Sequence, residues 1–364
     1  MTEWKEGVHR ENGLSSRLLA EIRSGLWRML PQAIAVVAAF LVGAVVLAVT
    51  GYSPVDVYAT MLAGAFGDVY GIGQTLTKAT PIIFTALAFL FSMKSGLFNI
   101  GAEGQLIIGG FAAALVGISF DGLPALIHVP LALLAGALAG GAWGFIPAIL
   151  RARLGAHEVI TTMMLSYVAT YLTSYMVNYP FKAPGWVAQT VSLAPSAQLP
   201  RILPPTQLSA SFIVALILVA LTYFVLQKTT FGYEVRASGL NPLAAENGGI
   251  NVKRTMIIAL FVSGAMAGLG GSGEVMGVHG RFIDGFSPGY GWDGLAVALV
   301  GGLNPVGVVI AAVLFGALRS GGMTMTRVTH VPLDIVIILQ SLVIIFVAAP
   351  TLIRYLLRWR EHKG

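Results

Sequence analysis

The polar residues with the most chemical potential lie in Ser95–Gln105, a glycine-punctuated segment between two apolar runs. Asn99, Glu103 and Gln105 bring two amides and a carboxylate into this segment. Irregular backbone between apolar helices persists only where protein or a water-filled cavity satisfies its peptide groups, and glycine permits such a break. We predict a broken helix beside a path for a polar solute, with an ordinary turn at a helix end as the alternative.

Three further polar residues lie at the start of an apolar run or inside one. Glu158 opens a long apolar segment, where the positive end of a helix dipole alone would explain a carboxylate, and Thr162 follows one turn later. Glu274 lies within an apolar run, where an ionisable group is costly and is a functional candidate. We predict that all three line the same path, with Glu274 either inside it or at its outer mouth.

A second polar segment spans residues 227–254 and combines glycines with charged residues. A short helix is expected from Asn241 to Asn247, because Pro242 suits a first helical turn. A short helix between two membrane spans suits docking into a groove of another protein, although a purely structural loop is equally consistent. The candidate docking residues of this segment are Gly232, Glu234, Arg236, Gly239, Asn241, Ala244, Ala245 and Gly249.

Segments that resemble nucleotide-binding motifs do not have the surrounding sequence that such motifs require, and the sequence shows no pattern of metal ligands. Gly268–Gly273 fits a dinucleotide-binding pattern, but it lies inside an apolar run and indicates close helix packing instead. Gly71–Lys78 lacks the second glycine of a phosphate loop. The chain has no cysteine and its histidines lack metal-site spacing. We therefore expect a chain that is not an enzyme, holds no metal, and binds no cofactor of its own.

The elements that position these residues are predicted to be membrane helices. Hydrophobic residues make up 56% of the chain and charged residues 10%, with a mean hydropathy of +0.80, whereas a soluble domain is about a quarter charged. Runs of about 20 apolar residues recur, and the strand alternation of a barrel does not. We expect an all-α polytopic membrane protein of about ten spans: Pro31–Thr50, Leu76–Met93, Leu106–Ser119, His128–Leu150, Val159–Tyr179, Ser209–Leu226, Met256–Val278, Trp292–Gly302, Pro305–Arg319 and Val331–Ala349.

Basic residues set the predicted orientation. They concentrate in the N-terminal tail, after residue 150, in segment 227–254 and in the C-terminal tail, and even numbers of spans separate these regions. The positive-inside rule then places both termini in the cytoplasm. The net charge of +6 follows from this bias and does not indicate nucleic-acid binding. The predicted parts are a cytoplasmic amphipathic arm (1–30), a transmembrane domain (31–350) with a proline-rich outer loop (180–208) and a cytoplasmic loop (227–254), and a cytoplasmic tail (351–364).

A weak internal duplication is also visible. Phe98–Gly101 and Phe286–Gly289 each open a glycine-rich apolar run. An odd number of predicted spans separates them, so the two copies would have inverted topology, as in many transporters. Chance similarity among glycine- and alanine-rich helices is the alternative.

Four motifs in order resemble the permeases of ABC importers for branched-chain amino acids, ribose-type sugars and nucleosides. They are Gly96–Gln105, Gly155–Leu165, Gly232–Ile250 and Gly277–Phe282, and the chain is most similar to the nucleoside or simple-sugar branch. The resemblance implies a type II-like ABC importer permease of about ten helices in two inverted repeats, with a coupling helix inside Gly232–Ile250. The chain departs from the family pattern at His157 and Ser166, where the family has asparagine.

The resemblance also implies a function and partners. The chain is expected to translocate a nucleoside or related simple sugar across a bacterial inner membrane. Its expected partners are a second homologous permease, an ATPase that holds ATP and Mg, an extracytoplasmic substrate-binding lipoprotein, and membrane lipid. From the residues alone, an ion-coupled secondary transporter that uses its membrane carboxylates is the alternative.

Overall fold

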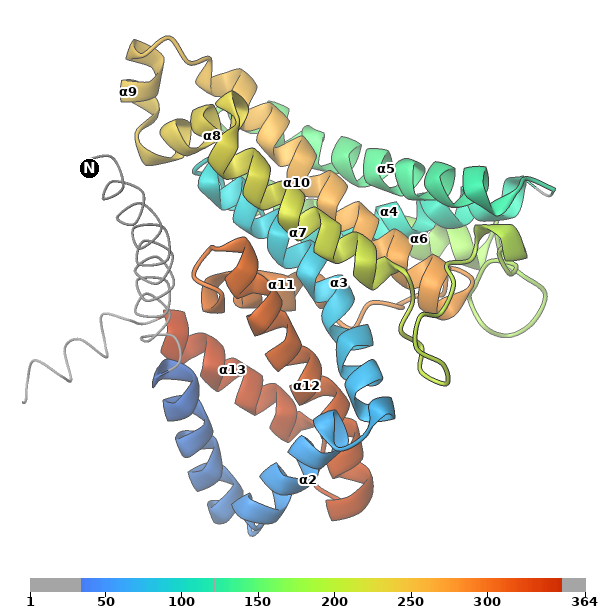
Figure 1. Cartoon of the computed structure of the whole chain (residues 1–364). Helices are drawn as coiled ribbons and strands as arrows, with labels where there is room; N and C mark the ends of the chain where they lie inside the picture. The colour runs from blue at the N-terminus through green and yellow to red at the C-terminus, as the bar shows by residue number, and fades with distance from the viewer. Residues whose placement is uncertain (1–33, 121, 349–364) are drawn as a thin grey trace, which may run out of the picture.

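The computed structural model describes residues 34–120 and 122–348, which fold into α-helices without a sheet (Figure 1). The helices are Ile34–Val49, α2 (Pro54–Phe66), α3 (Val69–Lys94), α4 (Ala102–Ser119), α5 (Ala125–Leu154), α6 (Glu158–Asn178), α7 (Ser211–Lys228), α8 (Thr230–Leu240), α9 (Pro242–Asn247), α10 (Val252–Glu274), α11 (Tyr290–Val300), α12 (Pro305–Thr329) and α13 (Asp334–Ala348). A 3₁₀ turn, η1 (Pro195–Ala197), and a π-helical extension of α10, η2 (Val275–His279), complete them. The predicted all-α class is confirmed.

Six of the described helices are long and apolar enough to cross a membrane: α3, α4, α5, α7, α10 with η2, and α12. The helix α6 has 21 residues but is more polar, while Ile34–Val49 and α13 are apolar but shorter. The span predicted at Trp292–Gly302 corresponds to α11, whose 11 residues reach about 16 Å, half of a bilayer core. The chain is therefore a multi-pass membrane protein in which α11 is too short for a full crossing.

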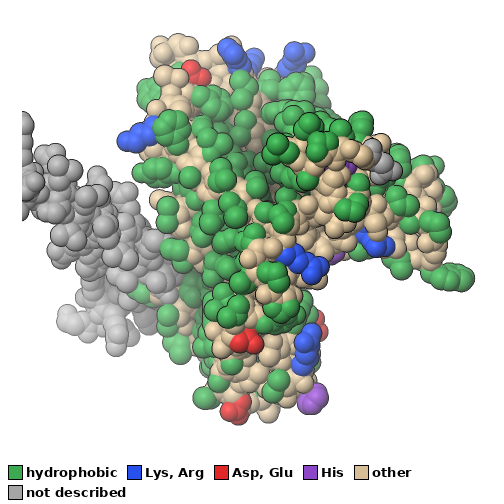
Figure 2. Space-filling view, turned by 45° about the vertical axis from the view of Figure 1, so that its right-hand side comes forward, with side chains coloured by type: hydrophobic (Ala, Val, Ile, Leu, Met, Phe, Trp, Pro, Cys, Tyr) green, Lys and Arg blue, Asp and Glu red, His purple; other side chains and the backbone are tan. Residues whose placement is uncertain are grey.

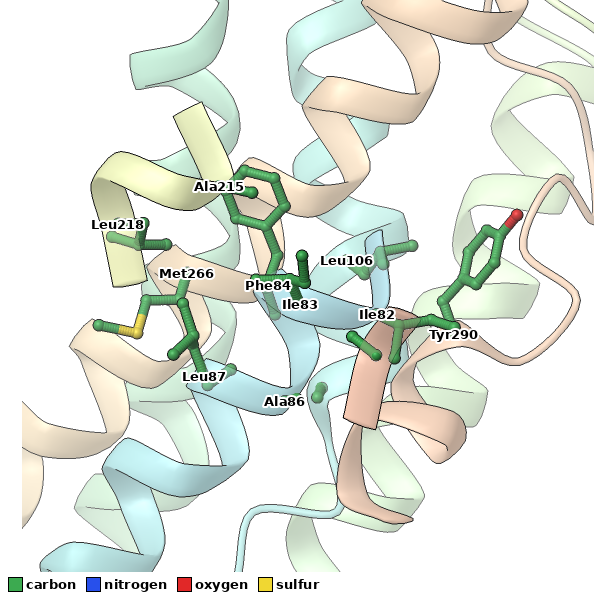
Figure 3. Packing of buried hydrophobic residues seen from close by; sticks show 14 of the residues in the cluster. Ile82, Ile83, Phe84, Ala86, Leu87, Leu106, Ala215, Leu218, Met266 and Tyr290 are labelled. Atoms are coloured by element: carbon green, nitrogen blue, oxygen red, sulfur yellow. The ribbon is translucent and has the colours of Figure 1, made fainter. Parts of the chain in front are cut away.

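The helix α3 lies at the centre of the bundle. In its most apolar 18-residue stretch, 83% of the residues are buried. The helix packs against α10, α11 and α12. Figure 3 shows side chains of α3 beside residues of four other helices, among them Ile82, Phe84, Leu87, Leu106, Leu218, Met266 and Tyr290. Because lipid tails are as apolar as these side chains, close packing rather than exclusion of water holds such helices together.

Glycines bring α4, α5 and α10 into backbone contact. A Cβ atom on Gly109 would lie 2.3 Å from the Cα of Gly268, and one on Gly140 would lie 2.5 Å from the carbonyl oxygen of Gly264. No larger side chain fits at such distances unless the helices separate. The packing role predicted for Gly268–Gly273 is thereby confirmed.

The helices α8 and α9 project from the end of the bundle at which α3 and α7 end (Figure 1). The short helix predicted from Asn241 is confirmed as α9, and the Asn241 Oδ1 accepts the N–H of Ala244 at 3.1 Å. The sequence analysis did not predict α8, since glycines and polar residues obscure its period. The segment 180–208 is irregular apart from η1. The predicted arm (1–30) and tail (351–364) lie outside the described residues.

Apolar side chains cover much of the surface of the bundle, and few charged side chains lie among them (Figure 2). Exposed leucine and isoleucine side chains run along α5 and α7, as expected of helices that face lipid. The positions at which exposed side chains are polar or aromatic instead are therefore informative.

Candidate functional site

The connection between α3 and α4 is non-helical and buried at Ser95, Leu97, Asn99 and Gly101. Its Asn99 Nδ2 donates to the Ser263 Oγ of α10 at 2.8 Å and to the Gln105 Oε1 of α4 at 2.9 Å. The Ser263 hydroxyl in turn donates to the carbonyl oxygen of Ala88 in α3 at 2.6 Å. Asn99 and Gln105 are each 1% exposed. The two amides thus satisfy each other and tie three helices together, while their place beside a path stays a prediction.

Glu103 joins the first turns of two helices that are far apart in sequence. Its carboxylate accepts the N–H of Gly291, at the start of α11, at 2.6 Å. A Cβ atom on Gly291 would lie 2.3 Å from the Glu103 nitrogen, so only glycine allows this approach. A carboxylate at a helix start is stabilised by the exposed N–H groups there. Residues 98–101 and 286–289, the proposed repeat motifs, therefore each lead into a helix whose first turn contacts the other.

The helix α6 supports the same region with hydroxyl groups. The Thr162 Oγ1 accepts the N–H of Ile100 at 3.2 Å, and the Ser166 Oγ accepts the N–H of Gly104 at 3.3 Å. Two orphan donors near the start of α4 are satisfied in this way. Ser166, one of the departures from the family pattern, is thus a buried contact between α4 and α6.

Glu158 is paired across the short connection between α5 and α6. Its carboxylate lies 3.3 Å from the Arg151 Nε, an ion pair whose geometry falls short of a hydrogen bond. Helix capping alone, the simpler explanation of Glu158, is therefore incomplete, because a specific basic partner is present.

Glu274 is buried near the end of α10, and its carboxylate lies 3.8 Å from the His279 Nε2. Close by, Arg319 of α12 donates through Nε to the Asp293 Oδ2 at 2.7 Å and lies over the Tyr290 ring, 5.5 Å from its centroid. The sequence analysis did not single out Asp293, Arg319 or Tyr290. A charged residue inside an apolar run was the available signal for Arg319.

A cavity of about 700 Å³ lies between α2, α3, α12 and the segment after Arg201. Lys78, Arg201 and Arg327 line it, and its one carboxylate, Asp68, already caps α3 by accepting the N–H of Gly71 at 2.6 Å. A second cavity of about 260 Å³ has Lys78 and Arg319 in its lining. Neither cavity is lined by any of the residues predicted for the path, namely Asn99, Glu103, Gln105, Glu158, Thr162 and Glu274.

The predicted docking residues divide into packing and exposed positions. A Cβ atom on Gly239 would lie 2.3 Å from the carbonyl oxygen of Lys94, so α8 packs tightly on the end of α3 beside Gly96. Gly232 packs equally closely on Val225 of α7. Ala245 is buried and Asn241 caps α9, while Ala244 and Gly249 are exposed and Glu234 is half-buried.

Two exposed leucines complete this end of the molecule. Leu240 and Leu243 are 88% and 74% exposed at the tip formed by α8 and α9. Arg236 donates to the Gln227 Oε1 at 2.8 Å and so holds α8 against α7. Apolar side chains on a projecting short helix suit burial in a groove of another protein. Within the described residues, no cluster of His, Asp and Glu could hold a metal ion.

Comparisons with known proteins add to this picture. The family model described as "Branched-chain amino acid transport system / permease component" matches residues 71–348. The chain is 40% identical over 344 residues to the guanosine ABC transporter permease protein NupP of Bacillus subtilis, covering 93% of this chain and 98% of the relative. It is 37% identical to the nucleoside permease NupB of Lactococcus lactis, covering 91% and 93% of the two chains. It is also 37% identical to the glucose permease TsgB13 of Haloferax volcanii, covering 85% and 84%.

The first two organisms each have a second relative with the same transporter name. NupQ of Bacillus subtilis is 32% identical over 68% of this chain, and NupC of Lactococcus lactis is 29% identical over 68%. Each of these two matches covers 80% of the relative's own length. No solved structure matches the chain significantly.

Proposed function

Because this chain belongs to the family of branched-chain amino acid transport system permease components, we propose that it carries a nucleoside through an ABC importer. The chain is a permease subunit of such a transporter and not an enzyme. The observation that carries the choice of substrate is the 40% identity to a guanosine permease over 93% of this chain. This identity extends over the buried break, the cytoplasmic projection and the outer loop together.

A second permease subunit, related to this chain but distinct from it, is part of the proposal. NupP with NupQ and NupB with NupC each supply two permeases under one transporter name, and this chain is more similar to the first of each pair. We therefore expect a heterodimer in which this chain occupies the NupP-like position. The inverted repeats and the count of about ten spans belong to the same proposal.

The remaining partners follow from the proposed ATP-driven import of a nucleoside. This chain has no nucleotide-binding motif, so a separate ATPase binds ATP and Mg, and a substrate-binding lipoprotein delivers the nucleoside from outside. The excess of basic residues at the α8–α9 end favours a cytoplasmic position for that end in an inner membrane, with both termini on the same side.

The helices α8 and α9 would pass movement of the ATPase to the permease. Leu240 and Leu243 are exposed for docking, and Gly239 places α8 in backbone contact with the end of α3. A shift of α8 therefore displaces the break that Asn99 spans. Since Glu103 ties the first turn of α4 to α11, the same shift reaches both halves of the bundle.

The predicted path residues have a positioning role in this proposal. Asn99, Gln105 and Glu103 hold the break, and Thr162 holds its backbone from α6. Glu158 fixes the connection between α5 and α6, and Glu274 lies buried near the opposite end. Movement of these contacts, rather than direct contact with substrate in the resting subunit, would open the path.

Uptake by intact cells with and without the gene tests the proposal. Labelled guanosine, adenosine and uridine are supplied with excess ribose or excess glucose as competitors. We expect uptake that is lost on deletion, restored by the wild-type gene and unaffected by either sugar. Unchanged nucleoside uptake in the deletion strain would contradict the proposal, and loss of glucose uptake instead would assign the chain to the function of the TsgB13 relative.

A further inference from the structure

The helix α6 has two faces of different chemistry. Its buried face carries Thr162, Ser166 and Thr173, which contact the protein. Its opposite face carries Tyr167, Tyr171 and Tyr175, and Tyr179 follows directly after the last helical residue. The spacing of four residues places the first three one above another along the helix. We call these four residues the tyrosine face of α6.

Two of these tyrosines are too deep to be an ordinary interfacial belt. Tyrosine is enriched where the bilayer meets water, which accounts for Tyr175 and Tyr179, whose rings lie 5.0 Å apart at one end of α6. Tyr167 lies about 14 Å along the helix from Glu158 and about 17 Å from Asn178. Tyr171 lies about 10 Å from Asn178. Both are near the middle of a membrane-length helix, and they are 48% and 72% exposed.

A lipid environment does not suit this face. A phenolic hydroxyl in hydrocarbon without a partner costs free energy. Among the described tyrosines only the Tyr58 hydroxyl makes a hydrogen bond, so those of Tyr167 and Tyr171 have no partner there. The preceding helix α5 presents Ile146 and Leu138 to the outside instead, about 12 and 24 Å from its end at Leu154. This range includes the distances of Tyr167 and Tyr171 from Glu158. Moreover, α6 is long enough to span a membrane, and Glu158 is its single charged residue. It is nevertheless less apolar than the six helices described above as able to cross. The exposed face of α6 therefore requires water, a polar ligand or a polar surface of the second permease subunit, and accessibility in the complete complex distinguishes them.

We propose that the tyrosine face of α6 lines the water-filled path and stacks against the base of the nucleoside. Every nucleobase has a π-face, and stacking on an aromatic side chain tolerates different bases. The hydroxyls of Tyr167 and Tyr171 remain hydrated or donate to the base edge. A ladder of rings along the helix offers successive stacking positions as the nucleoside crosses. This inference rests on the proposed function for the identity of the ligand, while its claim of a water-lined face does not.

Single-cysteine labelling tests the water-lined face, because the natural chain has no cysteine. Tyr167→Cys, Tyr171→Cys and the control Leu138→Cys on α5 are each assembled in the complete complex and treated with a charged methanethiosulfonate reagent. A thiol reacts as thiolate, which requires water. We expect labelling of both α6 positions and none of Leu138→Cys. Absence of labelling at both α6 positions, or equal labelling of Leu138→Cys, would overturn the proposal.

Protection and kinetics test the stacking. We expect guanosine to slow labelling of Tyr171→Cys, whereas ribose and glucose leave it unchanged. Tyr171→Leu should raise the KM for guanosine uptake on the order of tenfold, and Tyr171→Phe should change it less. Ile217→Ala on the apolar face of α7 is the matched control. Protection by sugars as strong as by guanosine, or an unchanged KM in Tyr171→Leu, would overturn base stacking. Labelling without any nucleoside uptake by the wild type would refute the proposed substrate but retain the water-lined face.

Discussion

The buried centre and the projecting helices α8 and α9 both carry polar, glycine-rich sequence, but they use it differently. In the centre, formed by α3, α4, α5, α10 and α11, polar groups bond to each other and glycines allow backbone contact. In the projection of α8 and α9, glycines fix the base on α3 while Leu240 and Leu243 stay exposed. The difference teaches that similar composition marks a fixed junction in one place and an exposed tip, our proposed docking surface, in the other. Substitutions in the centre should therefore affect stability, and substitutions at the tip should affect coupling.

The largest loss of stability is expected from Gly140→Leu. Its Cβ would lie 2.5 Å from the carbonyl oxygen of Gly264 and 2.8 Å from the Cα of Gly268. Backbone cannot move aside as a side chain can, so we expect most of the folded protein to be lost. Ala142→Leu, two residues along α5 on the exposed face, is the matched control. Monodisperse yield in detergent measures both, and equal yields would break the comparison.

A loss of about 3–5 kcal/mol is expected from Arg319→Met, because it leaves the Asp293 carboxylate mostly buried and unpaired. The double variant with Asp293→Leu should recover much of that stability, since no charge then remains unpaired. Thermal unfolding of the purified single and double variants measures the difference. A double variant less stable than Arg319→Met alone would contradict this account of the pair.

A smaller loss, about 1–3 kcal/mol, is expected from Asn99→Ala. The substitution leaves Gln105 and the N–H of Gly101 without the partners that Asn99 provides. Thermal unfolding again supplies the measurement, and Asn178→Ala near the far end of α6 is the control. If Asn99→Ala lowers transport without any loss of stability, Asn99 contacts the substrate rather than positioning the break.

Almost no loss of stability is expected from Leu243→Asp, although coupling should fail. The side chain is 74% exposed in the single subunit, so the bundle does not depend on it, whereas a carboxylate would oppose burial in an ATPase groove. ATPase stimulation by substrate in the reconstituted complex should fall to background, and Leu243→Met should retain it. Normal stimulation in Leu243→Asp would show that α9 is not the docking element.

The sequence predicted the elements better than the contacts between them. The break at Asn99 and the helix after Asn241 could be predicted, because glycine spacing and a proline in a first turn are local signals. The bond between Glu103 and Gly291 could not, since it joins residues far apart in the chain. The pairing of Asp293 with Arg319 was missed for the same reason. The helix α2 was missed because its 13 residues are too few for a span.

The predicted path residues illustrate the remaining limit. A polar residue in an apolar run has a free-energy cost of burial that some contact must offset. That contact is either a hydrogen bond within the helix bundle or a contact with the transported solute. Asn99 and Gln105 make the first kind of contact in the described structure. Tyr171, which was not singled out, is exposed. Burial decides between the two, and the sequence does not specify which face of a helix the protein covers.

The most direct test of the account is ATP-dependent guanosine uptake by the complete complex reconstituted in liposomes. With ATP supplied on the α9 side, we expect accumulation that is unaffected by a protonophore and absent in Leu243→Asp. Uptake that proceeds without ATP and stops when the ion gradient is collapsed would contradict the account and support the ion-coupled alternative.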